Sequence, residues 1–395
     1  MECACPACGA TRRKIDEEIS EQLDYRPAAL FVIEHARFVY ACKKCQSEVV
    51  TAPKPPQPID KGLPGPGLLA QIVVSKYADH LPLHRLERIF SRHGLPLTRS
   101  TMCDWVAAVA TKLLPLYDLL ARRVLLSKVL QSDDTIIPVL DPQSGKTHSS
   151  RMWVYLGDCR HPFIVFAYTT SRARAGPEEF LGDFEGFLQA DAYAGYDGIF
   201  AKNKIREIGC WAHARRKFYD ARDSDAARSH HMLGMIRQLY AVEKETKEMD
   251  DTARHAQRQT YARPQLDAIK RWLDEQAAQA LPKSPIGEAI RYALNQWAAL
   301  TRYVEDGAFA IDNNAAERAL RGVVLGRKNW LFAGSDKGGE TAAILYTFMA
   351  TCHQLDVEPF AYLRDVLTRL PAHPVERLTE LLPADWKQTQ PAPAS

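Results

Sequence analysis

The apolar pattern between residues 127 and 213 predicts a specific order of strands and helices. Apolar runs at 127–140, 151–158 and 163–170 are separated by short polar turns, which is typical of three consecutive antiparallel strands. A helical stretch at 176–184 follows, then a strand that ends at Asp191, a second helix, and a fifth strand that begins near residue 205. This order predicts an α/β fold with a ribonuclease-H-like core, whose first part spans residues 126–219.

Two aspartates lie where such a core would bring them together. Asp133 interrupts the apolar first strand, and Asp191 ends the fourth. A carboxylate in such a strand is costly to bury unless it is paired or binds a cation. Two converging carboxylates are tolerated when Mg²⁺ or Mn²⁺ bridges them. Asp134 is an alternative to Asp133, because neighbouring side chains on a strand point to opposite faces. Each aspartate taken alone is more often a turn or cap residue.

The core is predicted to be interrupted and then completed by helices. Residues 220–308 carry apolar residues at helical spacing, such as Leu266, Ile269 and Leu273, and we interpret them as an all-α insertion. Residues 309–352 complete the core, and 353–395 form a helical tail. The closing helix carries Glu317, which could form a capping box with Asn314, a role worth about 1 kcal/mol. Alternatively, Glu317 is a third acidic ligand beside the two aspartates.

Four cysteines near the amino terminus have the spacing of a metal site. Cys5 and Cys8 form one C-x-x-C pair, and Cys42 and Cys45 form another. Four thiolates in two such pairs make a closed tetrahedral Zn²⁺ site, and the stretch between them alternates like strands. We therefore predict a zinc ribbon at residues 1–50. Unpaired structural cysteines or a redox pair are the alternative.

A proline- and glycine-rich linker at 51–67 precedes a helical region at 68–125. Gly94 breaks the helical pattern, and Thr98 or Ser100 can cap the helix that follows. Two helices joined by a short turn fit a DNA-binding helix-turn-helix with Arg92 and Arg99 available to phosphates. Two core helices in an αα-hairpin fit the same pattern.

The net charge of +3 over 395 residues is only mildly basic, so a nucleic-acid partner must be argued from local clusters. Cationic side chains neutralise backbone phosphates and release counterions, and solvated helix faces are the alternative reading of such clusters. The predicted DNA-contacting residues are Arg92, Arg99, His213, Arg215, Arg216, Lys217, Arg318, Arg321, Arg327, Lys328 and the loop residue Lys337. No stretch approaches the roughly 18 to 20 apolar residues of a membrane span, and no secretory pattern is present, so we expect a cytoplasmic protein without a membrane partner.

Many short blocks of the chain together resemble the insertion sequence 66 family of bacterial DDE transposases. They include "CPACG", "KYADHLPLHR", "SDDTIIPVL", "LQADAYAGYD", "GCWAHARRKF", "DNNAAERALR" and "RKNWLFAGSDKGGETAAILYT", in the order of that family. The resemblance runs from about Cys5 to Trp386. It implies a catalytic triad of Asp133, Asp191 and Glu317 that binds Mg²⁺ or Mn²⁺. The family usually has Asp-Glu-Thr where this chain has Asp133, Asp134 and Thr135, which keeps an acid and leaves Asp133 as the ligand.

The resemblance also implies the activity and the partners. We expect metal-dependent cleavage at the ends of a mobile element and strand transfer into target DNA, with a structural Zn²⁺ in the ribbon. The expected partners are double-stranded DNA (terminal repeats and target), further copies of the chain in a homo-oligomer, and helper proteins of the same element, in association with the bacterial nucleoid. Members usually carry a further amino-terminal helical region, which we expect this chain to lack. A catalytically inactive DNA-binding or regulatory remnant is the alternative.

Overall fold

A computed structural model describes residues 7–11, 29–42, 49–59, 62–141, 143–191, 194–201 and 204–389. The chain divides into two units, residues 1–36 and 37–395. Every helix and strand named below belongs to the second unit, in which β1 (Val39–Tyr40) and β2 (Val50–Thr51) form a short antiparallel pair. Cys5 and Cys45 lie outside the described residues, so the predicted zinc ribbon is described only in part.

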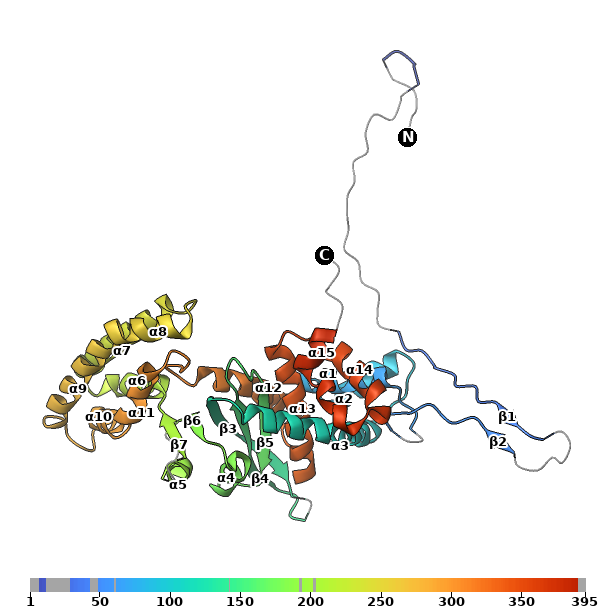
Figure 1. Cartoon of the computed structure of the whole chain (residues 1–395), viewed down its shortest axis with the longest axis horizontal. Coiled ribbons are helices and arrows are strands. Elements are labelled where there is room, and N and C mark those ends of the chain that lie inside the picture. The colour runs from blue at the N-terminus through green and yellow to red at the C-terminus, as the bar shows by residue number, and fades with distance from the viewer. Residues whose placement is uncertain are drawn as a thin grey trace. The chain divides into compact units, whose positions relative to one another are not determined.

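A five-stranded mixed sheet lies at the centre of the second unit (Figure 1). Its strand order is β5-β4-β3-β6-β7; β3, β4 and β5 are antiparallel neighbours, and β6 and β7 run parallel to β3. The strands are β3 (Val129–Leu140), β4 (Thr147–Leu156), β5 (Ile164–Thr169), β6 (Gly186–Gln189) and β7 (Ile205–Ile208). The five predicted strands are therefore confirmed, although β6 ends two residues before Asp191 and the fifth run becomes a helix at Trp211.

The edge strand β5 is covered by two long helices, α3 (Arg99–Val124) and α13 (Asp336–Gln354). The hydroxyl oxygens of Thr351 and Thr347 accept hydrogen bonds from the backbone N–H groups of Ile164 (3.1 Å) and Phe166 (2.9 Å). The Tyr117 hydroxyl donates to the Phe166 carbonyl (2.8 Å). Side chains therefore satisfy backbone groups that an edge strand would otherwise expose to a foreign strand.

Three helices precede the sheet: α1 (Pro66–Tyr77), α2 (Leu83–Arg92) and α3. Helix α1 begins within the predicted linker, with proline among its first residues, where the missing N–H costs nothing. Gly94 has a positive φ of 79° in the turn before α3, and the Thr98 hydroxyl accepts from the backbone N–H of Thr101 (3.3 Å), so the predicted break and cap are confirmed. Helix α3 has 26 residues, and its apolar side is buried in the main core.

The helices of the insertion build a second hydrophobic cluster, which also includes Val129 of β3, Ile208 of β7 and the buried side of the helix that follows β7. The insertion's helices are α7 (Ala226–Glu245), α8 (Asp251–Gln257), a π-helical turn (Arg258–Ala262), α9 (Arg263–Ala277), α10 (Pro285–Asn295) and α11 (Trp297–Thr301). The Arg258 side chain, 1% exposed, pairs with Glu243 (2.6 Å) and donates to the carbonyls of Tyr303 (2.8 Å), Asp306 (2.7 Å) and Phe309 (2.8 Å). This arginine fixes the segment that leads back from the insertion to the sheet.

The remaining elements join or cover these two cores. The helices are α4 (Ala175–Leu181), α5 (Asp197–Phe200), α6 (Trp211–Asp220), α12 (Asn314–Trp330), α14 (Pro359–Arg369) and α15 (Pro383–Thr389). The 3₁₀ turns are Ala194–Tyr196, Ala221–Asp223, Arg302–Glu305, Leu370–Ala372 and Val375–Leu381. Helix α14 packs against α1, so the tail adds buried residues such as Tyr362 and Leu363 to the main core.

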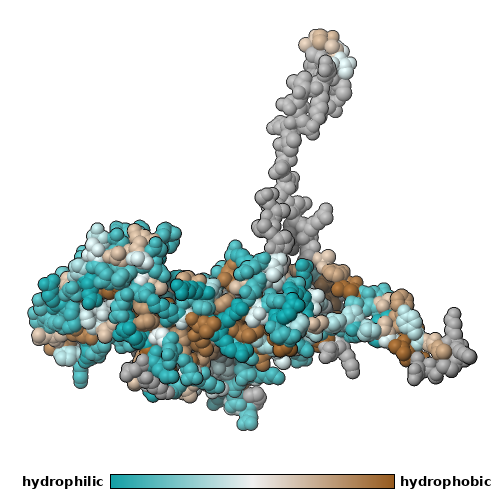
Figure 2. Space-filling model, in the orientation of Figure 1, coloured by the Kyte–Doolittle hydropathy of each residue, from teal (hydrophilic) through white to brown (hydrophobic). Residues whose placement is uncertain are grey.

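Most of the described surface in Figure 2 is hydrophilic, and the brown apolar areas are smaller. Among the described residues, none of the helices has both the length and the apolar character that crossing a bilayer requires.

Candidate active site

The two adjacent aspartates of β3, Asp133 and Asp134, are the alternative candidates for the acidic ligand, and they have different surroundings. The Asp134 carboxylate is 2% exposed and forms ion pairs with Arg151 (2.9 Å) and Arg172 (2.8 Å), so its charge is already compensated. Asp133 accepts a hydrogen bond from the backbone N–H of Asp134 (2.7 Å) and has no cationic partner within 4 Å among the described residues. Because neighbouring side chains on a strand point to opposite faces, Asp133 alone is free to meet other acids.

Asp191 follows β6, the parallel neighbour of β3. The two strands pair Val129 with Phe187 and Gln131 with Gln189, where β6 ends; the same register extended by two residues would place Asp191 opposite Asp133. Residues opposite each other in neighbouring strands are on the same face, about 5 Å apart. The buried Gln189 also ties the strands together, because its side-chain oxygen accepts from the Gln131 amide (3.0 Å).

The segment just before α12 is tied to the sheet and to α6. The Asn313 side chain, which is buried, donates to the carbonyl of Ser132 (2.8 Å), the residue before Asp133. The backbone N–H of Asn313 donates to the Cys210 sulfur (3.3 Å), and that of Trp211 donates to the Ile311 carbonyl (3.1 Å). Helix α12 therefore starts beside the strand that carries Asp133.

The capping box, one of the two roles that the sequence left open for Glu317, does not form. Asn314 is the first residue of α12, and the N-cap is Asn313, whose side chain makes no cap hydrogen bond because it is bound to the sheet. Asn314 instead donates from its backbone N–H and its side chain to Asp312 (3.1 and 2.8 Å). Glu317 is thus one position too far along the helix for the box.

Glu317 faces a histidine of α6. Its carboxylate lies 3.7 Å from Nε2 of His213, and the two side chains are 31% and 22% exposed. The other ring nitrogen, Nδ1, is buried without a hydrogen-bond partner in the described part of the chain. His213 therefore differs from its neighbours in the basic cluster of the sequence: it sits beside an acid, whereas Arg215, Arg216 and Lys217 are exposed.

The electrostatics of Asp133 reflect its position among acids. Burial, together with the negative charges of Asp191, Asp134 and Glu317, raises the pKa of Asp133 from 3.8 to about 7, against the backbone hydrogen bond from Asp134, which lowers it. The acids are therefore near enough to repel one another. Within the described residues, however, no three His, Cys, Asp or Glu side chains are grouped closely enough to hold a metal ion.

The other predicted DNA contacts are mostly at the surface. Arg92 ends α2 and Arg99 begins α3, and both are exposed, as are Arg318, Arg321 and Lys328 of α12. Lys337 is exposed but lies in the first turn of α13, not in a loop as predicted, because Ser335 caps that helix at the backbone N–H of Gly338 (3.2 Å). Arg327 donates to the Ile136 carbonyl and the Thr135 hydroxyl of β3, so it also holds α12 to the sheet.

Of the predicted zinc ligands, Cys8 and Cys42 are described, and both are exposed, unpaired thiols. They belong to different units of the chain, and Cys5 and Cys45 lie outside the described residues. Cys210, which precedes His213 in a C-x-x-H spacing, is buried and bound to the Asn313 backbone, so its role is structural.

Three family models match the chain, and together they cover most of its length. The family model described as "Transposase IS66 family" matches residues 61–341, "zinc-finger binding domain of transposase IS66" matches 2–46, and "IS66 C-terminal element" matches 347–384. Two uncharacterized proteins of Sinorhizobium fredii (strain NBRC 101917 / NGR234) are similar over most of their length. Protein y4hP is 35% identical over 98% of this chain and 74% of its own length, and y4jD is 34% identical over 98% and 79%. The chain belongs to the IS66 family of transposases.

Proposed function

We propose that this transposase cuts DNA at the ends of a mobile element and joins them to target DNA, using Asp133, Asp191 and Glu317 as its acidic triad. The observation that supports the proposal is the parallel register of β3 and β6, which points Asp133 and Asp191 toward one another just beyond the last pair, Gln131 and Gln189, next to a helix start bonded to Ser132. The ion pairs of Asp134 with Arg151 and Arg172 favour Asp133 over Asp134 as the ligand.

The proposal includes a ribonuclease-H-like core. It is supported by the strand order β5-β4-β3-β6-β7, in which the first strand of the sheet is central and the two parallel strands lie on one side of it. Residues 126–219 and 309–352 would form this core, and 220–308 would be an insertion whose buried side chains pack on α6 and one end of the sheet. The region at 68–125 would bind DNA through Arg92 and Arg99.

The donor set suits divalent metal ions that prefer oxygen ligands. Asp133 is a partly buried carboxylate without a cationic partner among the described residues, with other acids close enough to raise its pKa, and a cation would relieve that repulsion. The residues that would hold Mg²⁺ or Mn²⁺ are Asp133, Asp191 and Glu317. When bound, such ions stabilise the attacking and leaving oxygens of a phosphodiester exchange. Because the three acids are not yet grouped, the Glu317 side chain, 31% exposed, would rotate toward the aspartates.

The chain's own residues would position and hold the DNA. His213 would orient Glu317 through their 3.7 Å contact. Exposed cations on α6 and α12 (Arg215, Arg216, Lys217, Arg318, Arg321 and Lys328) would contact backbone phosphates and fix the strand over the acids. Cys5, Cys8, Cys42 and Cys45 would bind a structural Zn²⁺, in keeping with the zinc-finger match at 2–46.

The test is nicking of a duplex that carries the element's end, with and without Mn²⁺. We expect Asp133→Asn, Asp191→Asn and Glu317→Gln each to lower the nicking rate by at least about a thousandfold, as for groups that act together in the transition state. Asp183→Asn, a matched change at a fully exposed carboxylate, should leave the rate unchanged. Nicking that survives all three triad changes would refute the assignment.

An inactive DNA-binding protein is the second candidate, and the absence of a grouped metal site among the described residues favours it. The same duplex distinguishes the two. Binding without any metal-stimulated nicking by the unaltered chain would support the second candidate, and nicking that depends on Asp133 would exclude it.

A further inference from the structure

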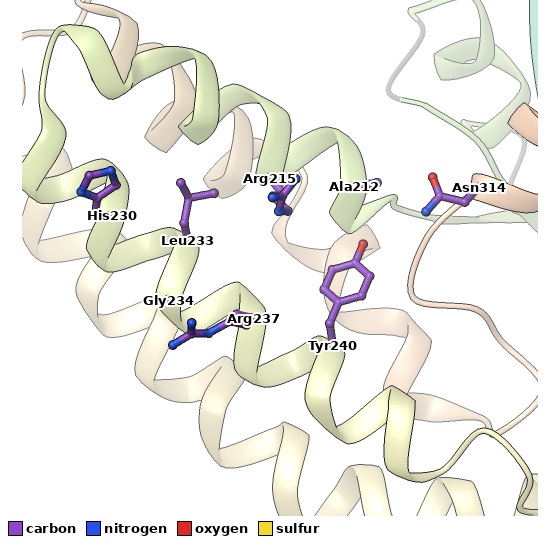
Figure 3. Close-up of a pocket in the computed structure, with 8 residues that line it drawn as sticks. All are labelled: Ala212, Arg215, His230, Leu233, Gly234, Arg237, Tyr240 and Asn314. Carbon is purple, nitrogen blue, oxygen red and sulfur yellow. The ribbon is translucent and has the colours of Figure 1, made fainter.

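A cavity of about 560 Å³ lies between α6, α7 and the first residue of α12 (Figure 3). Arg215 lines it from α6, and His230, Leu233, Gly234, Arg237 and Tyr240 line it from successive turns of α7. Ala212 and Asn314 complete the lining. A volume of this size is within the range of pockets that hold small ligands.

The cavity carries positive charge without a matching acid. Neither Arg215 nor Arg237 has a carboxylate within 4 Å among the described residues, and Arg215 lies only over the ring of Tyr219, 5.9 Å away. The carboxylate of the nearby Asp312 accepts hydrogen bonds from Tyr240 (2.9 Å) and Asn314 (2.8 Å) and forms no ion pair with either arginine. Two arginines with unused donors favour an anion, and their planar groups suit phosphate.

The wall of the cavity is kept open by a glycine. Gly234 lies inside the twenty-residue helix α7, and a Cβ added there would meet no atom within 4 Å. Glycine at an interior helical position costs about 1 kcal/mol relative to alanine, so α7 would be more stable with a side chain here. Leu233 beside it supplies apolar surface. The cavity thus combines a cationic part with an apolar one.

The cavity also lies near one of the proposed catalytic acids, Glu317. Ala212 directly precedes His213, and Asn314 lies one turn before Glu317. We propose that this cavity holds one unpaired nucleotide of the DNA strand at the cut site. Arg215 and Arg237 bind its phosphate, and its base lies against Leu233 and the ring of His230, as unpaired bases do on apolar and aromatic side chains. The proposal rests on the proposed function, since it assumes that DNA passes the acids.

The test measures binding of a fluorescein-labelled ten-nucleotide oligo-dT by anisotropy, in EDTA, so that metal-dependent chemistry does not contribute. We expect Gly234→Leu, which fills the cavity, to weaken binding at least tenfold, and Arg237→Gln to weaken it about fivefold. Gln238→Leu adds the same side chain at an exposed neighbour outside the lining, and Arg271→Gln removes the same charge from α9. Both controls should bind oligo-dT like the unaltered chain. Thermal unfolding should show Gly234→Leu to be at least as stable as the unaltered chain.

Two unlabelled competitors of the oligo-dT show whether the cavity prefers a nucleotide within a single strand to one in a duplex or one that is free. A duplex of the same sequence should compete through the surface cations alone, so its affinity should not change with Gly234→Leu. Free thymidine monophosphate should compete at least a hundredfold more weakly than the strand. Equal competition by the monophosphate would overturn the assignment to a DNA strand, and so would unchanged oligo-dT binding by Gly234→Leu.

Asp133→Asn separates this proposal from the proposed function. It should bind oligo-dT normally in EDTA while losing nicking. If Gly234→Leu binds oligo-dT normally but Asp133→Asn loses nicking, the cavity proposal is wrong and the triad stands. If Gly234→Leu loses oligo-dT binding but Asp133→Asn still nicks, the triad is wrong and the cavity proposal loses the strand path on which it rests.

Discussion

Asp133→Asn should make the metal-free protein more stable at neutral and alkaline pH. The change keeps the size of the side chain but removes a charge that has no cationic partner among the described residues. In the folded chain the pKa of Asp133 is raised from 3.8 to about 7, chiefly by burial. An acid whose pKa is raised on folding opposes folding wherever it must ionise.

The size of the effect follows from that shift. Below about pH 4 the carboxyl group is protonated in folded and unfolded chains alike, and the two proteins should be equally stable. Between pH 4 and 7 the unfolded chain has lost the proton while the folded chain keeps it, so the unaltered protein loses about 1.4 kcal/mol per pH unit relative to the variant. The shift from 3.8 to about 7 sets an upper limit of about 4 kcal/mol, reached near pH 8.

The assay is chemical unfolding of both proteins at pH 4, 6 and 8 in EDTA, with the free energies of unfolding compared at each pH. Comparison with the variant cancels the titration of every group that the two share. In Mg²⁺ at pH 8 the difference between the two proteins should shrink by about 2.7 kcal/mol, the stabilisation that an ion gives the folded state at a hundred times its dissociation constant. The variant, which lacks the ligand, should gain little.

Two results would refute this reasoning. If the difference between the proteins is the same at pH 4 and pH 8, the Asp133 carboxylate is not held in a setting that opposes its charge. If Mg²⁺ stabilises the variant as much as the unaltered protein, Asp133 is not a ligand.

Four further changes test other parts of the structure. Arg258→Met should lower the free energy of unfolding by about 3 to 5 kcal/mol in a denaturant titration, since it leaves Glu243 and three backbone carbonyls without their buried partner; a loss under 1 kcal/mol would contradict the role given to it. Asp134→Asn should also cost about 3 kcal/mol, at pH 8 as well as pH 6, because two arginines lose their acid, and greater stability at pH 8 would show that it behaves like Asp133. Asn313→Ala should slow nicking at least tenfold while DNA affinity, measured in EDTA, stays within twofold; equal losses of both would mean that it does not act by positioning α12. Cys8→Ser should release Zn²⁺ measured with a chromogenic chelator, whereas the same change at the exposed Cys103 should not.

The strands and the helices of the insertion could be predicted because their signals are local. Apolar runs between polar turns indicated the strands, and stripes such as Leu266, Ile269 and Leu273 proved to be buried. The Gly94 break and the Thr98 cap also depend only on neighbours within a turn. Such features need no knowledge of distant partners.

What the sequence could not supply were the long-range partners. Nothing near Asp134 indicates that Arg151 and Arg172, on another strand and in a later loop, compensate it, so the choice between the two aspartates could not be made from the residues alone. The capping box failed for the same reason, because the Asn313 side chain bonds to Ser132. The sequence predicts that His213 contacts DNA, because basic residues follow it. In the structure its side chain instead lies 3.7 Å from the Glu317 carboxylate.

The hydrogen bond from Asn313 to Ser132 spans 181 residues of chain. During synthesis the ribosome therefore releases the sheet with its two aspartates long before the glutamate helix exists. Until the whole insertion has emerged and folded, the growing polypeptide has only part of its proposed cutting centre. A nascent chain of this protein should consequently be harmless to the DNA around it, and cutting activity would begin only with a nearly full-length product.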